Sequence, residues 1–553
     1  MKLKSNLQIC LAQLNPIVGD VEYNSSKVLN IIEKHREADL IIFPEMFLVG
    51  YPLMDHIYDP IIKTKNEEAI EKIRKKSSET AIILGTFTES PKIEDKLHPF
   101  FNSALLIQEK EIKAIINKRL LPDYDVFNER RYFSFDDKFL PVKVKEYNIG
   151  ILICEDLWDE NYEINVAKKL KENKADILIV INASPYHINK FKLRKELVSK
   201  KAWELKLPII YLNMVGGLDE IVYDGQSFVV NEHGQMTFKA KSFEEHIETI
   251  DLIKLNQKQI DSTESKIDWK EEVLKALKLN LYDYYHKSGI FKGVVLGLSG
   301  GIDSTFTAYI CAKALGSDKV TAIMMPTRFT SQLSIDYAKK LCQNLKISYI
   351  IHPIDKLFEA YESSIRDNLG KLQFDIADEN LQSRIRATIL MYYSNKFDWL
   401  LVSTGNKSEI GVGYCTLYGD TNGGKNIPGD LFKVQIYEIC EYINKNKEII
   451  PHDIIQRAPT AELRKDQKDT DSLPPYEILD KILEVITKKG IGSDFEMLIK
   501  QGIDLKTIRK VEHLYLSSEY KRRQLVQTIK VSESAFGIGR RYPVLKRIDI
   551  EGF

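Results

Sequence analysis

Short apolar runs alternate with amphipathic stretches through the first half of the chain. Each run is rich in Ile, Leu and Val and ends at polar or turn-forming residues, so each predicts a buried β-strand. Strands that alternate with helical stretches favour an α/β domain around a largely buried sheet. We place these strands at 7–14, 39–45, 81–87, 149–158, 176–184 and 208–215.

A polar stretch then interrupts the pattern. Residues 254–270 read KLNQKQIDSTESKIDWK, which is nearly free of apolar residues and lacks helical periodicity. We therefore predict a first domain over 1–255, a linker over 256–270 and a second domain over 271–553. In the second domain, apolar runs separated by enough chain for crossover helices predict a doubly wound parallel sheet. These runs lie at 294–299, 320–326, 348–354 and 399–404.

The composition argues against a nucleic-acid-binding or membrane protein. The 553 residues include 79 Lys+Arg and 79 Asp+Glu, so no excess of one charge suggests a nucleic-acid or membrane partner. The chain lacks an apolar run of the ~20 residues that a membrane-spanning helix needs. The first apolar run, in MKLKSNLQICLAQLNP, is too short and too polar for a signal peptide, so we expect none. Neither a C-x-x-C nor an H-E-x-x-H zinc motif occurs. Scattered cysteines predict free thiols in a reducing cytoplasm: Cys10, Cys154, Cys311, Cys342, Cys415 and Cys440.

A strand followed by glycines and hydroxyl residues predicts a phosphate-binding loop. In VVLGLSGGIDST the glycines let backbone N–H groups approach an anion, and the following helix begins with partial positive charge. No Lys follows, as a Walker loop requires, but Asp303 could hold Mg²⁺ beside a pyrophosphate. The alternative is a plain strand-to-helix turn with Asp303 as a cap. The predicted ATP-binding residues are Gly297, Leu298, Ser299, Gly300, Gly301, Ile302, Asp303 and Ser304.

This loop resembles the one in enzymes that split ATP into AMP and pyrophosphate. ENLQSRIR (379–386) and STGNKSEIGVGYCTLYGD (403–420) resemble the NAD synthetases in particular, and 457–480 and 519–523 also fit that family. The resemblance implies that Thr404 contacts ATP and that Glu409, with Asp303, meets Mg²⁺. It also implies a set of residues around deamido-NAD, namely Asn380, Arg384, Glu409 and Lys521. A solvated helix-face charge is the alternative for Glu409.

Three chemically unusual positions occur in the first domain. Cys154 ends the run IGILICEDLW, Glu45 ends an apolar run in FPEMFLVGYP, and Lys118 opens the loop NKRLLPDYD. Burying a carboxylate or an ammonium at the end of an apolar strand costs folding free energy. Such residues are therefore candidates for a functional site. The alternative for Cys154 is a buried structural cysteine.

These segments resemble the nitrilase superfamily, whose amidases use a Glu, Lys and Cys set. The resemblance implies that Glu45 deprotonates Cys154 and later protonates ammonia, while Lys118 stabilises the oxyanion. Two interpretations of Glu129 are equally open. It is either a second catalytic acid or a surface residue beside two arginines.

Two further segments, 181–194 and 211–229, resemble the glutaminase domain that is fused to NAD synthetases. By that resemblance, three residues match positions that hold glutamine: Tyr124, Ser184 and Lys190. The sequence departs from the family at three others. Met214 stands where Gln is usual, and Asp125 and Asn128 stand where Gly and Asp are usual.

The combined resemblance implies a nitrilase-like α-β-β-α sandwich followed by a doubly wound ATP-pyrophosphatase domain. Glutamine would supply ammonia, ATP would adenylate deamido-NAD, and the products would be NAD, AMP, pyrophosphate and glutamate. Mg²⁺ is the implied cofactor, and a homo-oligomer is expected. One alternative is a related enzyme that acts on another adenylated acceptor, and a second is a first domain that serves only as a scaffold.

Overall fold

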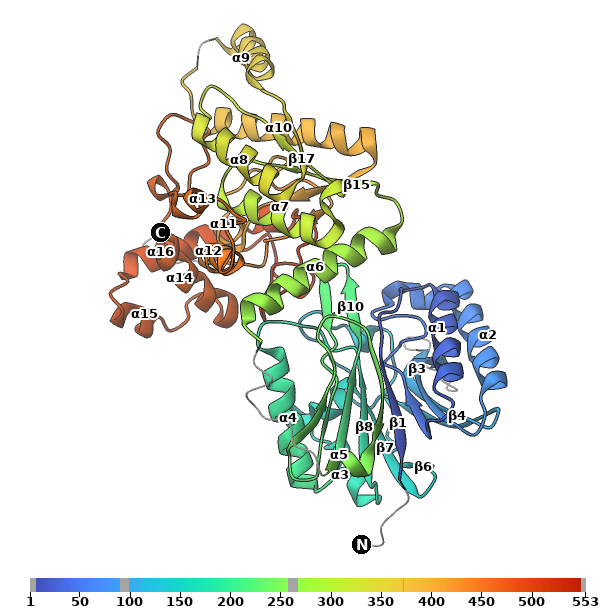
Figure 1. The fold of residues 1–553 in the computed structure, drawn as a ribbon. Helices are drawn as coiled ribbons and strands as arrows, with labels where there is room; N and C mark the ends of the chain where they lie inside the picture. Colours follow the sequence, from blue (N-terminus) through green and yellow to red (C-terminus); the bar gives the residue numbers. More distant parts are fainter. Residues whose placement is uncertain (1–5, 90–98, 257–266, 371, 549–553) are drawn as a thin grey trace. The chain divides into compact units, whose positions relative to one another are not determined.

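Two units make up the structure (Figure 1). This computed structural model describes all residues except 1–5, 90–98, 257–266, 371 and 549–553. Contacts assign Met1–Gly216 and Val222–Ile267 to the first unit, and Gly217–Ile221 and Asp268–Phe553 to the second. Most of the linker predicted at 256–270 lies outside the described residues.

Two six-stranded sheets organise the described part of the first unit. The first has the order β14-β1-β2-β3-β4-β5, with β1, β2 and β3 parallel to one another and the other pairs antiparallel. Its strands are β1 (Gln8–Gln13), β2 (Leu40–Ile42), β3 (Ala81–Glu89), β4 (Phe100–Gln108), β5 (Glu111–Asn117) and β14 (His246–Asp251). The expected strands at 7–14 and 81–87 are therefore confirmed, and the strand expected at 39–45 is present but shorter, because it ends at Ile42.

The second sheet has the order β13-β12-β9-β8-β7-β6 and a parallel centre formed by β7, β8 and β9. Its strands are β6 (Val142–Val144), β7 (Tyr147–Ile153), β8 (Ile177–Asn182), β9 (Ile209–Asn213), β12 (Phe228–Val230) and β13 (Met236–Lys239). The strand expected over 149–158 is shorter than predicted. It ends at Ile153, and a 3₁₀ turn, η3 (Cys154–Leu157), follows.

The two sheets pack face to face. Ile9 and Ile83 from one sheet and Ile151 and Ile179 from the other are buried in a single cluster. Helices cover the outer faces, with α1 (Val21–Lys34) and α2 (Pro60–Lys76) on the first sheet in Figure 1. On the second sheet, α3 (Val166–Glu172) and α4 (Lys190–Leu205) pack against outward-facing apolar residues. This arrangement confirms the predicted α-β-β-α sandwich.

The second unit contains the predicted doubly wound sheet. Its order is β17-β16-β15-β18-β19, and the four neighbouring pairs of strands run parallel. The strands are β15 (Gly293–Gly297), β16 (Val320–Met324), β17 (Ser348–Ile351), β18 (Trp399–Ser403) and β19 (Lys425–Asn426). The helices that pack on or beside the sheet are α6 (Trp269–Ser288), α7 (Ile302–Leu315), α8 (Gln332–Leu345), α9 (Asp355–Leu369), α10 (Ile376–Phe397) and α12 (Lys433–Asn444).

The second unit also contains a helical cluster apart from the sheet. It has its own apolar core, which includes Ile410, Leu479, Leu483 and Ile508. Its helices are α11 (Lys407–Val412), α14 (Tyr476–Lys489), α15 (Glu496–Lys500) and α16 (Leu505–Ser517). The short helix α13 (His452–Gln456) lies between α11 and α14 in the chain, and α17 (Glu519–Arg522) follows α16. Within the described ranges, no helix combines the length and apolar character needed to span a membrane.

A short hairpin consists of β10 (Val215–Leu218) and β11 (Ile221–Asp224). Its tip, Gly217–Ile221, belongs to the second unit, although the residues on either side belong to the first. The Asn280 amide of α6 donates to the carbonyls of Asp219 (3.0 Å) and Ile221 (2.9 Å). The Gly217 N–H donates to the Asp283 carboxylate at 2.6 Å. A Cβ at Gly217 would lie 2.6 Å from the Asn280 Cα, so the close approach requires glycine.

A buried ion pair connects α11 to the segment at 531–532. The Lys407 ammonium lies 2.7 Å from Asp430, and both side chains are buried. Asp430 also accepts hydrogen bonds from the backbone N–H groups of Val531 (2.8 Å) and Ser532 (2.6 Å).

We expect Asp430→Ala to lower the free energy of unfolding of the second unit by about 3–5 kcal/mol, because it leaves a buried ammonium without its counter-ion. Urea denaturation followed by tryptophan fluorescence measures this loss. The control is Glu484→Ala, which removes one partner of the exposed Lys488–Glu484 pair and should cost below about 1 kcal/mol. Equal losses in the two variants would contradict the prediction.

Candidate active sites

Cys154 stands at the point where β7 ends and η3 begins. Its backbone has φ 43°, in the left-handed region that L-residues rarely adopt, and its side chain is 3% exposed. Such strain persists where the surroundings hold it, and it often marks a functional position. The thiol is therefore turned out of the strand direction and held in a closed environment.

A buried ammonium links the other predicted catalytic residues. Lys118 Nζ lies 2.8 Å from Glu45 Oε1 and 2.8 Å from Glu129 Oε1, and all three side chains are at most 3% exposed. Asn102 Nδ2 (2.8 Å) and the Ala183 N–H (2.7 Å) also donate to the Glu45 carboxylate. Glu129 is thus part of this cluster, and the surface alternative for it is wrong.

Burial and charge set the protonation of this cluster. Burial raises the pKa of the Cys154 thiol well above its usual range, and the Glu45 carboxylate raises it further. Burial alone would lower the pKa of Lys118, but Glu129 and Glu45 outweigh it and raise that pKa. Burial also raises the pKa of Glu129 to about 7. The ammonium therefore stays charged, while the thiol needs a base to lose its proton.

Asp156 fixes the loop of Lys118 to the turn of Cys154. Its buried carboxylate accepts from the N–H groups of Arg119 (2.8 Å) and Leu120 (2.9 Å), which directly follow Lys118. It also accepts from the Ile153 N–H at 3.1 Å, just before the cysteine. One side chain thus sets the position of both segments.

Two of the predicted glutamine-binding residues lie beside this cluster. The Tyr124 hydroxyl donates to Glu155 Oε2 at 2.9 Å, and Glu155 is the residue after the cysteine. Lys190 Nζ lies 4.4 Å from the centre of the Trp158 ring. Burial lowers the pKa of Lys190 to about 8. Glu155 was not among the predicted site residues, although its place next to Cys154 is a signal for it.

The remaining predicted residues of this unit lie in the supporting structure around the site. Ser184 Oγ accepts from Arg194 Nε at 3.2 Å, and its N–H donates to Asn213 Oδ1 at 2.9 Å. Met214 is buried at the foot of the hairpin, with its N–H donating to the Asn182 carbonyl. Asp125 and Asn128 both fall in the loop after Lys118, where Asp125 has φ 49°.

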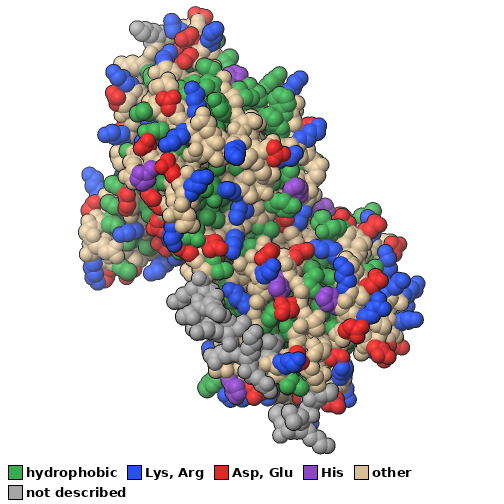
Figure 2. All heavy atoms as spheres, in the orientation of Figure 1, with side chains coloured by type: hydrophobic (Ala, Val, Ile, Leu, Met, Phe, Trp, Pro, Cys, Tyr) green, Lys and Arg blue, Asp and Glu red, His purple; other side chains and the backbone are tan. Residues whose placement is uncertain are grey.

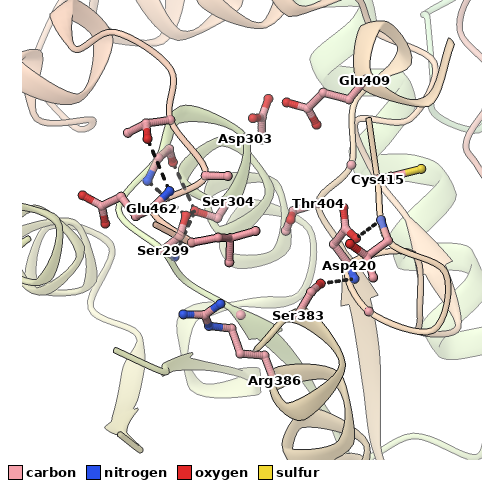
Figure 3. A pocket seen from close by; sticks show the side chains of 18 of the residues that line it. Ser299, Asp303, Ser304, Ser383, Arg386, Thr404, Glu409, Cys415, Asp420 and Glu462 are labelled. Atoms are coloured by element: carbon pink, nitrogen blue, oxygen red, sulfur yellow. Dashed lines mark hydrogen bonds between the residues drawn. The ribbon is translucent and has the colours of Figure 1, made fainter. Parts of the chain in front are cut away.

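The second unit contains a pocket of about 420 Å³ at the carboxyl ends of its strands (Figure 3). The predicted loop from Gly297 to Ser304 lines it. Ser299 Oγ accepts from the Gly301 N–H at 3.2 Å, and Ser304 Oγ lies 3.1 Å from Ser299 Oγ. Gly300 has φ 82°, and a Cβ there would lie 2.3 Å from the Ser334 carbonyl oxygen. The loop therefore needs this glycine, and it presents the start of α7 to the pocket.

Lys433 of α12 bridges the two predicted metal ligands. Its Nζ lies 2.5 Å from Asp303 Oδ2 and 3.1 Å from Glu409 Oε1. Burial raises the pKa of Glu409 to about 7, against the lowering effect of Lys433. The two carboxylates thus converge on one cation, and their oxygen ligands are of the type that Mg²⁺ prefers. In the described part of the chain, no third His, Cys, Asp or Glu completes an all-protein metal site.

Three further predicted residues line the same pocket, and one does not. Thr404, Asn380 and Lys521 are among its walls. The Asn380 side chain accepts from the Thr416 hydroxyl at 2.7 Å, and Lys521 Nζ donates to the Gly413 (2.8 Å) and Cys415 (2.7 Å) carbonyls. Arg384 is exposed on α10, where its Nε donates to the Leu417 carbonyl at 3.1 Å.

Arg386, two residues beyond Arg384, lines the pocket instead. Its Nε donates to the Met325 carbonyl at 3.1 Å, and its guanidinium points into the pocket in Figure 3. Burial lowers its pKa to about 10, so it remains a cation at neutral pH. The sequence prediction missed Arg386 and Lys433, although the spacing in SRIR allowed a choice between the two arginines.

Comparison with known proteins matches both units to protein families. The carbon-nitrogen hydrolase family matches residues 8–259, and the NAD synthase family matches residues 273–525. A relative from Synechocystis sp. is 38% identical and is described as a glutamine-dependent NAD(+) synthetase; the match covers 98% of this chain and 99% of the relative. A relative of the same description from Acinetobacter baylyi is also 38% identical, with 98% of both chains covered.

Solved structures agree with this assignment. The glutamine-dependent NAD(+) synthetase of Acinetobacter baumannii, solved with ADP, is 34% identical, covers 98% of both chains and has a TM-score of 0.77. The synthetase of Cytophaga hutchinsonii, at 21% identity and a TM-score of 0.83 over 98% of both chains, shares the fold. Both halves and nearly the full length are thus accounted for, and the chain belongs to the family of glutamine-dependent NAD(+) synthetases.

Proposed function

We propose that the chain amidates deamido-NAD to NAD, with ATP as the energy source and glutamine as the nitrogen donor. The observation that carries the proposal is the pairing of two sites in one chain. The first unit holds a thiol beside the Lys118 cluster, and the second holds a phosphate-type loop beside converging carboxylates. The names of the full-length relatives favour deamido-NAD over another adenylated acceptor.

In the first unit, Glu45 takes the proton of Cys154, and the thiolate attacks the amide carbon of glutamine. The Lys118 ammonium stabilises the oxyanion, because Glu129 and Glu45 keep it charged. Glu45 then returns the proton to the departing ammonia, which leaves a thioester on Cys154. Water attacks the thioester to release glutamate and restore the thiol.

In the second unit, the α-phosphorus of ATP bonds to the nicotinate carboxylate of deamido-NAD, and pyrophosphate leaves. The loop at Gly300 and Gly301 and the start of α7 hold the phosphates. Asp303 and Glu409 are the residues that would hold Mg²⁺, which would neutralise charge on the departing pyrophosphate. Arg386, a cation at the pocket wall, would bind the nucleotide. Ammonia then displaces AMP from the acyl adenylate to form NAD.

The proposal also includes a homo-oligomer and a cytoplasmic location. The six cysteines are unpaired in the structure, which suits a reducing compartment.

We expect Cys154→Ala to abolish glutamine-dependent NAD synthesis and to leave ammonium-dependent synthesis largely intact, because alanine offers no nucleophile while the second unit keeps its own site. Mass spectrometry of NAD formed from each nitrogen source measures both. Cys10→Ala is the matched control, since Cys10 is a buried strand cysteine of the same unit. Retained glutamine-dependent synthesis in Cys154→Ala would overturn the nucleophile assignment.

We expect Asp303→Asn and Glu409→Gln to lower NAD formation from both nitrogen sources by ~10²-fold or more, because adenylation precedes either use of ammonia. Steady-state rates with glutamine and with ammonium chloride test this. Asp318→Asn, at an exposed carboxylate of the same unit, should leave both rates unchanged. A normal ammonium-dependent rate in the two site variants would exclude the metal-ligand role.

We expect the KM for glutamine to rise as the pH passes 8, because Lys190, whose pKa is lowered to about 8, then loses the charge that binds the glutamine carboxylate. The charge is present below that pKa and absent above it. Lys190→Met should have a high KM and lack this rise between pH 7 and 8.5, whereas Lys192→Met, at an exposed lysine of α4, should behave like the wild type. Glutamate release measures all three, and a shared pH profile would refute the role.

A further inference from the structure

Arg194 of α4 is a charged residue that the first unit buries completely. Figure 2 shows many Lys and Arg side chains at the surface of the protein, but Arg194 is 0% exposed. Taking a guanidinium out of water costs folding free energy unless hydrogen-bond acceptors surround it. The steps of glutamine cleavage do not use this side chain directly, so its partners indicate what it does.

All three nitrogen atoms of the guanidinium donate hydrogen bonds. Nη1 donates to both carboxylate oxygens of Asp224, at 2.7 and 2.9 Å. Nη2 donates to the carbonyls of Ser184 (2.8 Å) and Pro185 (3.0 Å), and Nε donates to Ser184 Oγ at 3.2 Å. Because the guanidinium is planar and rigid, these bonds hold Ser184 by its side chain and by its backbone at the same time.

Ser184 is one of the residues expected to hold glutamine, and it follows a residue that contacts the proposed base. The N–H of Ala183 donates to the Glu45 carboxylate at 2.7 Å. Ser184 Oγ accepts from Arg194 Nε, so the hydroxyl keeps its own proton for another acceptor. Arg194 therefore fixes the segment that presents this hydroxyl close to the proposed base.

Arg194 also affects the charge of Lys190, the other glutamine-binding residue on α4. The two residues are four positions apart and lie on the same face of the helix. After burial, the Arg194 charge is the main cause that lowers the pKa of Lys190 to about 8. Three groups oppose this effect and raise that pKa, namely Cys154, Glu155 and Asp125.

We propose that Arg194, held in place by Asp224, is a positioning residue that orients Ser184 for glutamine. It acts through Ser184 and does not touch the substrate. The inference rests on the proposed function, since it requires that the first unit binds glutamine.

The first test is Arg194→Lys, assayed by glutamate release. The KM for glutamine should rise by ~10-fold or more, because one ammonium cannot bond Asp224 and Ser184 in the geometry of the guanidinium. The kcat should change much less, because Glu45 keeps its hydrogen bonds from Lys118 and Asn102.

A double-mutant cycle shows whether Arg194 acts through Ser184. Ser184→Ala alone should raise the KM for glutamine. In that background Arg194→Lys should raise it little further, because the hydroxyl that Arg194 orients is already absent.

A second variant keeps the test sharp if a buried, unpaired charge disturbs folding. Arg194→Gln with Asp224→Asn removes both charges of the pair together. The matched control is Lys201→Gln with Asp159→Asn, which removes another buried ion pair of α4. That pair connects α4 to η4 (Asp159–Asn161) and not to Ser184. Both double variants should lose stability in urea, but only the first should raise the KM.

The pH dependence of the KM separates charge from geometry. In Arg194→Gln with Asp224→Asn, the rise of the KM near pH 8 should move to higher pH, because Arg194 no longer lowers the pKa of Lys190. Arg194→Lys keeps a positive charge and should leave the rise where it is in the wild type.

Three results would overturn the inference and leave the proposed function in place. They are an unchanged KM in both folded Arg194 variants, equal rises of the KM in the Arg194 and Lys201 double variants, and additive effects of Arg194→Lys and Ser184→Ala. A wild type that releases no glutamate from glutamine would instead overturn the proposed function, and the inference with it.

Discussion

A buried lysine ammonium shared between two carboxylates organises each of the two sites. Removing one ammonium from water costs several kcal/mol, so the lysine can be buried only because carboxylates surround it. Two carboxylates exceed one ammonium by a full negative charge, and that excess must attract a proton or a cation. Burial raises the pKa of one carboxyl in each cluster to about 7. The clusters are Glu45, Lys118 and Glu129 in the first unit, and Asp303, Lys433 and Glu409 in the second.

The same electrostatic arrangement serves different chemistry in the two units. In the first, the excess charge lies beside a thiol whose pKa is raised, so a proton can move between sulphur and carboxylate. In the second, it lies beside the glycine loop at the pocket wall, where the excess negative charge favours a cation. The surroundings decide the outcome. A strained cysteine turn accompanies one cluster, and a glycine loop with a helix N-terminus accompanies the other.

The sequence was sufficient to predict those parts of the fold in which a reactive or polar residue directly follows a buried strand. Glu45 follows β2, Cys154 follows β7, and the phosphate loop follows β15, so an apolar run next to a polar residue was a usable signal. The strands β4, β5, β6 and β10 to β14 were missed. Most of them are short, as β6 and β12 are, or are largely exposed, as β5 and β14 are, and so lack a continuous apolar run. The buried strand β4 was missed although it is nine residues long.

Local sequence patterns could not predict the site residues that tertiary packing brings into place. Lys433 lies on α12, 130 residues after the carboxylate that it meets, and nothing near it in the chain marks it. Arg386 and Arg384 belong to the same short motif, and only the rotation of α10 decides which of them enters the pocket. Glu129 was predicted as equally a surface or a site residue, because one of its buried partners, Tyr51, lies 78 residues away in the chain.

The hairpin tip at 217–221 shows that the two units are not separated at a single point in the chain. By sequence the two halves look separable, since each matches a different family and a polar stretch divides them. Yet α6 of the second unit bonds to backbone groups of Gly217, Asp219 and Ile221, which are encoded within the first half. A gene cut at the polar stretch would deprive α6 of these partners and leave Asn280 and Asp283 without them. The boundary in the sequence and the boundary in the fold therefore differ, because a segment of the first half belongs to the folded body of the second unit.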